Sequence, residues 1–121
     1  MPGLRKGRYI ARLAAVPQDV ERAQALRHMC FRTARGLSDV DGRDADAFDA
    51  DCQHVLVEDA KSGTLVCCFR LMPLEGGAEI GRSYSAQYYD LSRLADYTGR
   101  MVEMGRFCIH PGWTDPDILR I

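Results

Sequence analysis

Long apolar runs are missing from this sequence of 121 residues. A membrane-spanning helix needs about 20 consecutive apolar residues, and no segment approaches that length. The first eight residues also lack the apolar middle of a signal peptide. We therefore expect a cytoplasmic protein. Peripheral contact with a membrane stays open, although no long basic amphipathic stretch is present to make it.

An excess of charge of either sign is missing as well. Sixteen Lys and Arg residues stand against seventeen Asp and Glu residues, so the net charge at pH 7 is −1. This balance gives no broad electrostatic field that would attract a nucleic acid, and we expect no such partner. Hydrophobic residues at 46% and charged residues at 27% are typical of a folded chain, which at this length fits one domain, 1–121.

The five cysteines lack the C-x-x-C spacing of common zinc modules, and their odd number does not suit a disulfide framework. Two Cys-x-His pairs, Cys52 with His54 and Cys108 with His110, would share strand faces and could supply four zinc ligands. Structural zinc ligands usually come in turn-like spacings, so we expect no metal. Cys108 is also a weak candidate for a nucleophile, because the sequence places no histidine within reach of it.

What the sequence does contain is apolar periodicity that changes along the chain. Alternating or continuous apolar runs predict four strands, at Tyr9 to Val16, His54 to Glu58, Leu65 to Met72 and Met101 to Ile109. From Gln18 to about Thr33 the apolar residues recur at steps of three and four, which predicts a helix. With neither repeats nor a low-complexity linker, this order favours one incomplete α/β unit.

The segments between these elements carry turn and capping signals. Arg35 to Asp51 is predicted to be a long ordered loop, and Asp59 to Gly63 a hairpin turn. Pro73 to Gln87 reads as a glycine-containing connection, followed by a short helical turn over Leu91 to Asp96 with Asp90 as its N-cap. Asp115 and Pro116 would open a helix that the sequence cuts off at Ile121.

The loop before the second predicted strand is acidic, with Asp44, Asp46, Asp49 and Asp51 around Phe48. A solvated loop of turn-forming side chains is one interpretation. The other is functional, in which the carboxylates hold a cationic substrate or position an arginine. Spacing alone does not choose between them.

Charged residues also interrupt the last predicted strand. Glu103 and Arg106 are three apart, so strand alternation would point them to opposite faces unless the strand bulges at Met104 and Gly105. Glu103 is the best candidate for a general base, because an ammonium must lose a proton before its nitrogen can attack a carbonyl carbon. A structural ion pair of Glu103 with Arg27 or Arg70 is the alternative.

Arg27 and Phe31 lie four apart on one face of the predicted helix, which could direct an arginine toward the acidic loop beside an aromatic wall. Phe31 by itself is more typical of a core. Arg70 interrupts an apolar strand, and a charge in such a place usually faces either solvent or a carboxylate partner.

Taken in order, these stretches resemble a known family. They are Arg27-x-x-x-Phe31, Asp46-Ala47-Phe48-Asp49-x-x-Cys52-x-His54, Phe69-Arg70-Leu71 and Glu103-x-Gly105-Arg106. The set is similar to the ornithine acyl-carrier-protein N-acyltransferases, GNAT-fold enzymes of ornithine-lipid synthesis, over nearly the whole chain from Tyr9 to Ile121. The resemblance implies an α/β fold of the α+β type: a mostly antiparallel central sheet flanked by helices, here truncated after the fourth strand.

The acyl-homoserine-lactone synthases, which use S-adenosylmethionine, resemble the same framework of arginines, aspartates and Glu-x-x-Arg. The Cys52-x-His54 pair and the segment from Tyr84 to Gln87 favour the ornithine branch. A tryptophan expected after the first helix of many lactone synthases is absent. The framework therefore fixes the superfamily better than the substrate.

The resemblance implies transfer of a 3-hydroxyacyl group to the α-amino group of L-ornithine, giving lyso-ornithine lipid. The acyl donor would be carried on the phosphopantetheine of acyl carrier protein, or be an acyl-CoA, with no other cofactor. Glu103 would receive or orient the amine as the catalytic residue. The acceptor side would be shaped by Asp46, Asp49, Arg70 and Arg106, with Arg27 and Phe31 stabilising that loop.

The family domain continues past Ile121, and its later part supplies much of the thioester cleft. The resemblance therefore gives no expectation that these 121 residues are active by themselves. Absent later strands would leave an exposed sheet edge, which predicts aggregation or a homodimer. A non-enzymatic alternative is a binding or dimerisation module in which the arginine and aspartate network is only structural.

Overall fold

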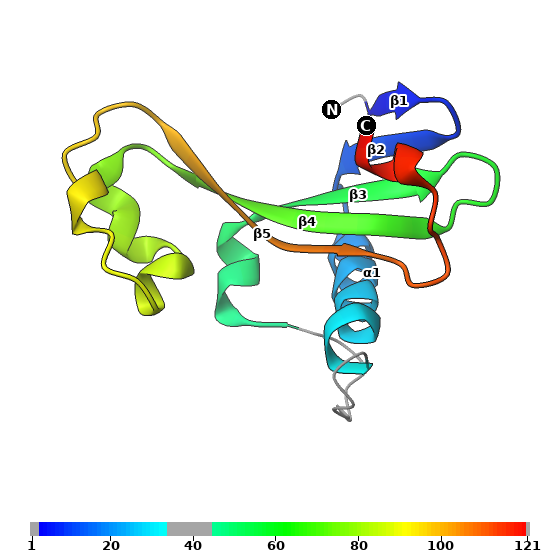
Figure 1. Cartoon of the computed structure of the whole chain (residues 1–121), viewed down its shortest axis with the longest axis horizontal. Coiled ribbons are helices and arrows are strands. Elements are labelled where there is room, and N and C mark those ends of the chain that lie inside the picture. The colour runs from blue at the N-terminus through cyan, green and yellow to red at the C-terminus, as the bar shows by residue number, and fades with distance from the viewer. Residues whose placement is uncertain (1–2, 34–44, 121) are drawn as a thin grey trace.

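A computed structural model gives the structure of residues 3–33 and 45–120. It contains one five-stranded sheet in which every neighbouring pair of strands is antiparallel (Figure 1). The strands lie in chain order across the sheet: β1 (Leu4–Lys6), β2 (Tyr9–Leu13), β3 (Gln53–Asp59), β4 (Leu65–Leu74) and β5 (Met101–Ile109). In the described part of the chain, no helix is long and apolar enough to cross a membrane.

The four strands expected from the sequence are all present. The sheet has a fifth strand, β1, so the count of four was wrong. Leu4–Lys6 is a short edge strand with every residue exposed, and its single apolar side chain gives no alternating pattern to detect. The hairpin between β3 and β4 turns at Gly63, whose φ of +74° lies in the left-handed region that glycine adopts without strain.

The predicted helix runs from Pro17 to Arg27 as α1 and continues as a π-helical segment over His28–Thr33. Pro17 stands in the first turn, where its missing N–H costs no hydrogen bond. Asp19 closes that turn by accepting the N–H of Ala15 at 2.8 Å, and it also receives both terminal nitrogens of Arg12 at 2.9 Å. The start of α1 is therefore fastened to β2.

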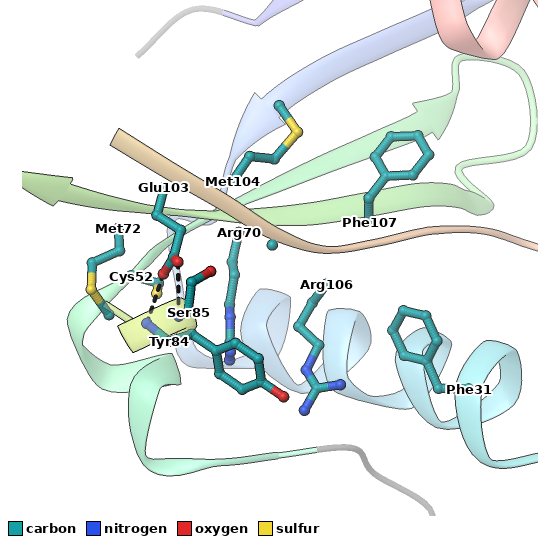
Figure 2. A pocket seen from close by; sticks show the side chains of 11 residues that line it. Phe31, Cys52, Arg70, Met72, Tyr84, Ser85, Glu103, Met104, Arg106 and Phe107 are labelled. Carbon is teal, nitrogen blue, oxygen red and sulfur yellow. Dashed lines mark hydrogen bonds between the residues drawn. The ribbon is translucent and has the colours of Figure 1, made fainter. Parts of the chain in front are cut away.

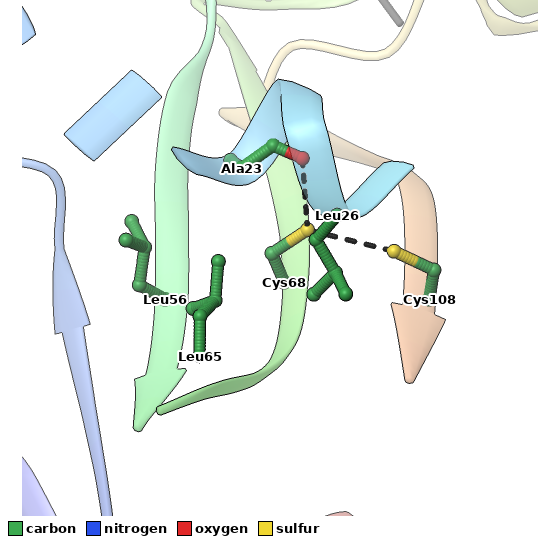
Figure 3. Packing of buried hydrophobic residues seen from close by; sticks show 6 residues of the cluster. All are labelled: Ala23, Leu26, Leu56, Leu65, Cys68 and Cys108. Carbon is green, nitrogen blue, oxygen red and sulfur yellow. Dashed lines mark hydrogen bonds between the residues drawn. The ribbon is translucent and has the colours of Figure 1, made fainter. Parts of the chain in front are cut away.

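One face of the sheet packs against α1 and forms the main core. Ala23 and Leu26 of the helix meet Leu56, Leu65, Cys68 and Cys108 of three strands (Figure 3). Cys68 donates weakly to the carbonyl oxygen of Ala23 at 3.7 Å and lies 3.6 Å, sulfur to sulfur, from Cys108. The cysteines of this core pack as small apolar side chains.

The opposite face is covered at one end by the 3₁₀ turn Pro116–Arg120, whose Ile118 packs with Tyr9, Val57 and Val66. Asp115 precedes that turn as expected, accepting the Asp117 N–H at 3.0 Å and the Tyr9 hydroxyl at 2.6 Å. The bond to Asp115 and burial raise the pKa of Tyr9 to about 12. Farther along this face, a shallow apolar cavity of about 360 Å³ is lined by Leu13, Val55, Phe69 and Leu71 among others.

The connection between β4 and β5 folds into a lobe beyond the ends of those strands (Figure 1). It contains three 3₁₀ turns, Gly77–Arg82, Ser85–Gln87 and Ser92–Leu94. Gly77 is required there, because a Cβ atom at this position would overlap the backbone oxygen of Leu94. The expected turn is present in a shorter form, but its N-cap residue is Leu91 and not Asp90, whose carboxylate accepts the Ser92 N–H at 3.0 Å.

The acidic loop is described only in its second part. Ala47–Asp51 is a 3₁₀ turn with Asp46 as its N-cap, whose carboxylate accepts the Phe48 N–H at 3.0 Å. The loop expected from Arg35 to Asp51 is therefore helical over its last five residues. Residues 35–44, which include Asp44, lie outside the described residues.

Candidate active site

A β-bulge in β5 brings Glu103 and Arg106 to the same face of the sheet. The register of β4 and β5 shifts by one residue, so that Arg70 faces Gly105 while Cys68 faces Cys108. Two residues of β5, Arg106 and Phe107, therefore stand opposite the single residue between them on β4. The sequence predicted a bulge at Met104 and Gly105, and the structure has it two residues later, at Arg106 and Phe107.

The bulge forces Arg106 into the left-handed region, with φ of +51°. Such a conformation costs a non-glycine residue about 1–3 kcal/mol, and strained residues of this kind cluster at active sites and ligand-binding sites. Its effect is visible in Figure 2, where Glu103, Arg70 and Arg106 point toward α1 and Met104 and Phe107 point away. Without the bulge, Arg106 would project from the opposite face.

These side chains line a cavity of about 280 Å³ (Figure 2). Its walls come from the π-helical segment after α1, the end of the acidic turn, β4, the middle of the lobe and β5. They are formed by Phe31, Cys52, Arg70, Met72, Tyr84, Ser85, Glu103, Met104, Gly105, Arg106 and Phe107. Pockets for drug-sized ligands measure about 300–1,000 Å³, so this one suits a small molecule. Gly105 keeps it open, because its missing side chain would stand 3.9 Å from Arg70 Nε.

Glu103 is held in this cavity by the backbone of the lobe. The N–H of Tyr84 donates to Glu103 Oε1 at 2.8 Å, and the N–H of Ser85 donates to Oε2 at 3.0 Å. Each carboxylate oxygen has two lone-pair positions, so each can accept a second hydrogen bond from a ligand. Glu103 is thus fixed in orientation and still able to bind a cation.

Arg70 and Arg27 are engaged by the two aspartates of the acidic turn. Arg70 Nη1 donates to Asp46 Oδ1 at 2.7 Å and to Asp49 Oδ1 at 2.9 Å, while Nη2 donates to Asp46 Oδ2 at 3.1 Å. Arg27 donates to both oxygens of Asp49, at 2.8 and 3.1 Å. Among the described contacts, these arginines pair with aspartates and not with Glu103, which was the alternative raised by the sequence.

Three of the four charged members of the network are almost completely buried, while the side chain of Asp46 is 25% exposed. Arg27 is 1% exposed, Arg70 is 3% and Asp49 is 9%. Burial opposes ionisation of Asp49, but the bonds from Arg27, Gln24 and Arg70 outweigh it and lower its pKa to about 2. Burial acts against Asp46 in the same way, and the bond from Arg70 leaves its pKa below the ordinary value. Both carboxylates are therefore ionised at neutral pH.

The structure thus assigns the predicted site residues to two layers. Glu103, Arg106, Arg70 and Phe31 line the cavity directly. Asp46 and Asp49 lie behind Arg70 and hold its guanidinium in place, and Arg27 in turn holds Asp49. Arg27 is directed to the acidic turn, as the sequence predicted, where it binds Asp49, while the Phe31 ring lies 5.8 Å from the guanidinium of Arg106.

Tyr84 and Ser85 were not among the candidate site residues. Their backbone N–H groups hold Glu103, and the Tyr84 ring lies 5.4 Å from the guanidinium of Arg106 and 5.5 Å from that of Arg70. Backbone donors leave no trace in a sequence pattern, because every residue except proline has one. The resemblance of the segment around Tyr84 was the only available signal.

The sequence also raised two alternative chemistries, a Cys108 nucleophile and a zinc site made by two Cys-x-His pairs. Contact with Cys68 and burial raise the pKa of Cys108, which does not favour the thiolate that a nucleophile needs. His54 is buried and its Nε2 lies 3.0 Å from the carbonyl oxygen of Asp49. Within residues 3–33 and 45–120, no group of three or more potential ligands is arranged to hold a metal ion.

Comparison with known proteins agrees with this architecture. A family model described as "Acetyltransferase (GNAT) domain" matches residues 26–120. The chain belongs to the GNAT acetyltransferase domain family. The GNAT match begins in α1 and includes the acidic turn, β3, β4, the lobe and β5, and so contains every residue that lines the cavity.

Three curated relatives of this GNAT chain carry the name L-ornithine N(alpha)-acyltransferase. The protein from Rhodobacter capsulatus is 35% identical over 113 residues, which are 85% of this chain and 44% of the relative. Those from Brucella abortus and Agrobacterium fabrum are 34% and 32% identical, over 88% of this chain and 42% and 41% of the relatives. The chain therefore spans less than half the length of these relatives. No solved structure matches it.

Proposed function

We propose that this chain carries the amine-binding side of an N-acyltransferase that acylates the α-amino group of L-ornithine. The single observation that carries the proposal is the setting of Glu103. Its carboxylate is oriented by two backbone N–H groups and lines a small cavity that Arg70 and Arg106 also line. The three relatives named L-ornithine N(alpha)-acyltransferase support ornithine as the acceptor.

The reaction requires a base at this place. The α-ammonium of ornithine first gives a proton to Glu103, directly or through a water molecule. The freed nitrogen then attacks the carbonyl carbon of the acyl thioester and forms a C–N bond. The C–S bond breaks, the thiolate leaves and is protonated, and the second amine proton is lost, so the products are an amide and a thiol.

The arginine and aspartate network has a supporting part in this proposal. Asp46 and Asp49 hold Arg70 rigidly under the cavity, and Arg70 in turn forms the wall below Gly105. A fixed wall limits the positions that a small acceptor can adopt, which raises the fraction of bound molecules in a reactive geometry. Arg27 contributes by holding Asp49.

The donor in this proposal is a 3-hydroxyacyl group carried by acyl carrier protein, and the product is lyso-ornithine lipid. This donor is taken from the family resemblance of the sequence. A cavity of about 280 Å³ is small for an acceptor and a long acyl chain together. The acyl chain would then extend from the cavity toward parts of the protein outside these 121 residues.

The test is acyl transfer by the full-length protein from 3-hydroxyacyl carrier protein to a panel of amines. The panel contains L-ornithine, L-lysine, S-adenosylmethionine and 1,4-diaminobutane, and mass spectrometry identifies the product. Nα-acylated ornithine as the main product is the expected result. Preferred acylation of S-adenosylmethionine would identify a lactone synthase instead. No transfer to any amine would favour a binding or dimerisation module.

A further inference from the structure

A second polar side chain, that of Ser85, lies in the cavity next to Glu103. The backbone N–H of Ser85 donates to Glu103 Oε2 at 3.0 Å, which fixes the residue beside that carboxylate. The residue is half-buried and lines the cavity. Figure 2 shows the Ser85 hydroxyl pointing from the lobe toward β5, on the side where the Glu103 carboxylate lies. A group bound to Glu103 from the cavity would therefore also meet this hydroxyl.

The fold makes no use of the Ser85 hydroxyl. A serine near the start of a turn commonly bonds through its hydroxyl to a neighbouring backbone group. Ser83 does so, since its hydroxyl donates to the carbonyl oxygen of Ile80 at 2.8 Å and accepts the Ala86 N–H at 3.2 Å. Within residues 3–33 and 45–120, the Ser85 hydroxyl makes no such bond. It is therefore available to a ligand.

Few oxygen acceptors surround the cavity. In the part of the chain that the structure describes, three side chains with oxygen atoms line it, those of Glu103, Ser85 and Tyr84. The Tyr84 hydroxyl points away from Glu103 (Figure 2). Guanidinium groups only donate hydrogen bonds. Glu103 and Ser85 are therefore the side-chain oxygen acceptors that one small cation could reach together.

A primary ammonium group requires more acceptors than one carboxylate supplies. It carries three N–H donors, whose directions diverge, so a single carboxylate does not accept all three at favourable angles. A donor that enters a cavity without an acceptor loses its bond to water and weakens binding. The Ser85 oxygen, with two lone pairs, can accept an N–H that Glu103 does not.

We propose that Ser85 is a binding residue for the acceptor amine, its hydroxyl oxygen accepting one N–H of the α-ammonium group while Glu103 accepts another. This inference rests on the proposed function and adds a second contact to the reacting nitrogen. Two contacts from different elements, β5 and the lobe, fix the position of that nitrogen better than one. They also favour a primary amine over a secondary one, which has one N–H fewer.

The test compares L-ornithine with Nα-methyl-L-ornithine in the full-length protein. Ser85→Ala keeps the backbone N–H that orients Glu103 and removes only the hydroxyl. It should lower kcat/KM for L-ornithine about 10- to 100-fold, the usual effect of losing a hydrogen bond to a charged group. The loss should appear mainly in KM, because the bond already forms when the substrate binds. The methylated acceptor should lose much less, so the preference of the wild type for ornithine should shrink.

A matched control and a second readout separate binding from folding. Ser92→Ala, at an exposed serine of the same lobe, should leave both acceptors unaffected. Ser85→Thr should restore most of the activity, since it restores the hydroxyl. Titration calorimetry should show weaker ornithine binding by Ser85→Ala than by Ser92→Ala, independently of turnover.

Two results would overturn the inference and leave the proposed function standing, provided that the wild type acylates L-ornithine. One is equal losses of kcat/KM for the two acceptors in Ser85→Ala, which would indicate a structural role. The other is ornithine binding by Ser85→Ala that equals that of Ser92→Ala. A wild-type protein that acylates no α-amino acid would overturn both the inference and the proposed function.

Discussion

At the scale of single residues, two residues of β5 determine the charge and the free space of the cavity. Glu103 supplies the carboxylate, and Gly105 supplies the space above Arg70 by having no side chain. The φ of Gly105 is not in the positive region, unlike those of Gly7 and Gly63. A larger residue at position 105 would therefore meet little backbone strain and would instead fill the cavity.

The substitution Gly105→Leu tests whether filling the cavity abolishes activity while the fold stays stable. We expect the melting temperature of the full-length protein to change by only a few degrees, because the added side chain enters open space beside Arg70. We expect kcat/KM for ornithine to fall about 100-fold, because the acceptor is displaced from the base. Gly81→Leu, at an exposed glycine with nothing within 4 Å of its Cβ position, is the matched control. Full activity of Gly105→Leu would show that the acceptor binds elsewhere.

The ionisation of Asp49 gives a prediction for pH. Its pKa in the folded protein is about 2, below the ordinary value of 3.8, so the stability that it contributes is complete above about pH 4. That contribution is lost as the pH falls through about 2. NMR titration of the Asp49 side-chain carboxyl carbon should give a midpoint near 2. A midpoint at or above 4 would mean that the bonds from Arg27 and Arg70 do not hold in solution.

At the scale of secondary-structure elements, one ion network joins three parts of the chain. Arg27 comes from the end of α1, Asp49 from the turn Ala47–Asp51, and Arg70 from the middle of β4. The network is buried, so removing one member leaves a charge without its partner in a place that water hardly reaches. The position of the acidic turn against the sheet depends on it.

The substitution Arg27→Met tests whether this ion network holds the acidic turn against the sheet. We expect the free energy of unfolding, measured by urea denaturation, to fall by about 3–5 kcal/mol, because Asp49 loses a buried partner. Arg120→Met is the control, since Arg120 pairs with Asp117 at the surface with 65% of its side chain exposed. Surface pairs contribute about 0–1 kcal/mol. Equal, small effects of the two substitutions would show that the network does not fasten the turn.

The sequence predicted the elements where side chains alternate clearly. β3, β4 and β5 were found because their apolar residues follow a strand pattern, and α1 because its apolar residues follow a helical one. β1 was missed because Leu4–Lys6 is exposed and held by backbone pairing with β2, which leaves no side-chain pattern. The 3₁₀ turns of the lobe were largely missed for a similar reason, since short turns have no period.

The site was predicted in its residue types but not in its pairings. Charged residues in apolar strands must find partners, so Arg70 and Glu103 could be selected from the sequence alone. Which carboxylate binds which arginine depends on the fold around β4. The hydrogen bonds that orient the Glu103 carboxylate form only because the lobe folds back to β5. Their donors are the backbone N–H groups of Tyr84 and Ser85. No residue type encodes that contact.

At the scale of the whole molecule, the sheet ends in an edge that remains open in the described chain. β5 is the last strand in the order, and Val102, Met104 and Phe107 are all more than 40% exposed on it. Exposed apolar edge strands pair readily with other chains. The curated relatives are more than twice as long as this chain, so their additional residues are available to cover such an edge.

The 121-residue chain by itself should therefore self-associate. Analytical ultracentrifugation should show dimers or larger species that increase with concentration, and Val102→Lys should shift the population toward monomer because a charge on an edge strand opposes pairing. Lys61→Ala, in the distant hairpin turn, is the control. A monomer at every concentration would show that the edge of β5 does not pair with a second chain.

The measurement that tests the central claim most directly is the turnover number of the Glu103→Gln variant of the full-length protein with L-ornithine and 3-hydroxyacyl carrier protein. Removal of the base should lower kcat by about 10²- to 10⁴-fold. Circular dichroism and the melting temperature should stay close to those of the wild type, and Glu75→Gln, at an exposed carboxylate of the lobe, should retain full activity. Wild-type turnover in a folded Glu103→Gln protein would contradict the assignment of Glu103 as the base.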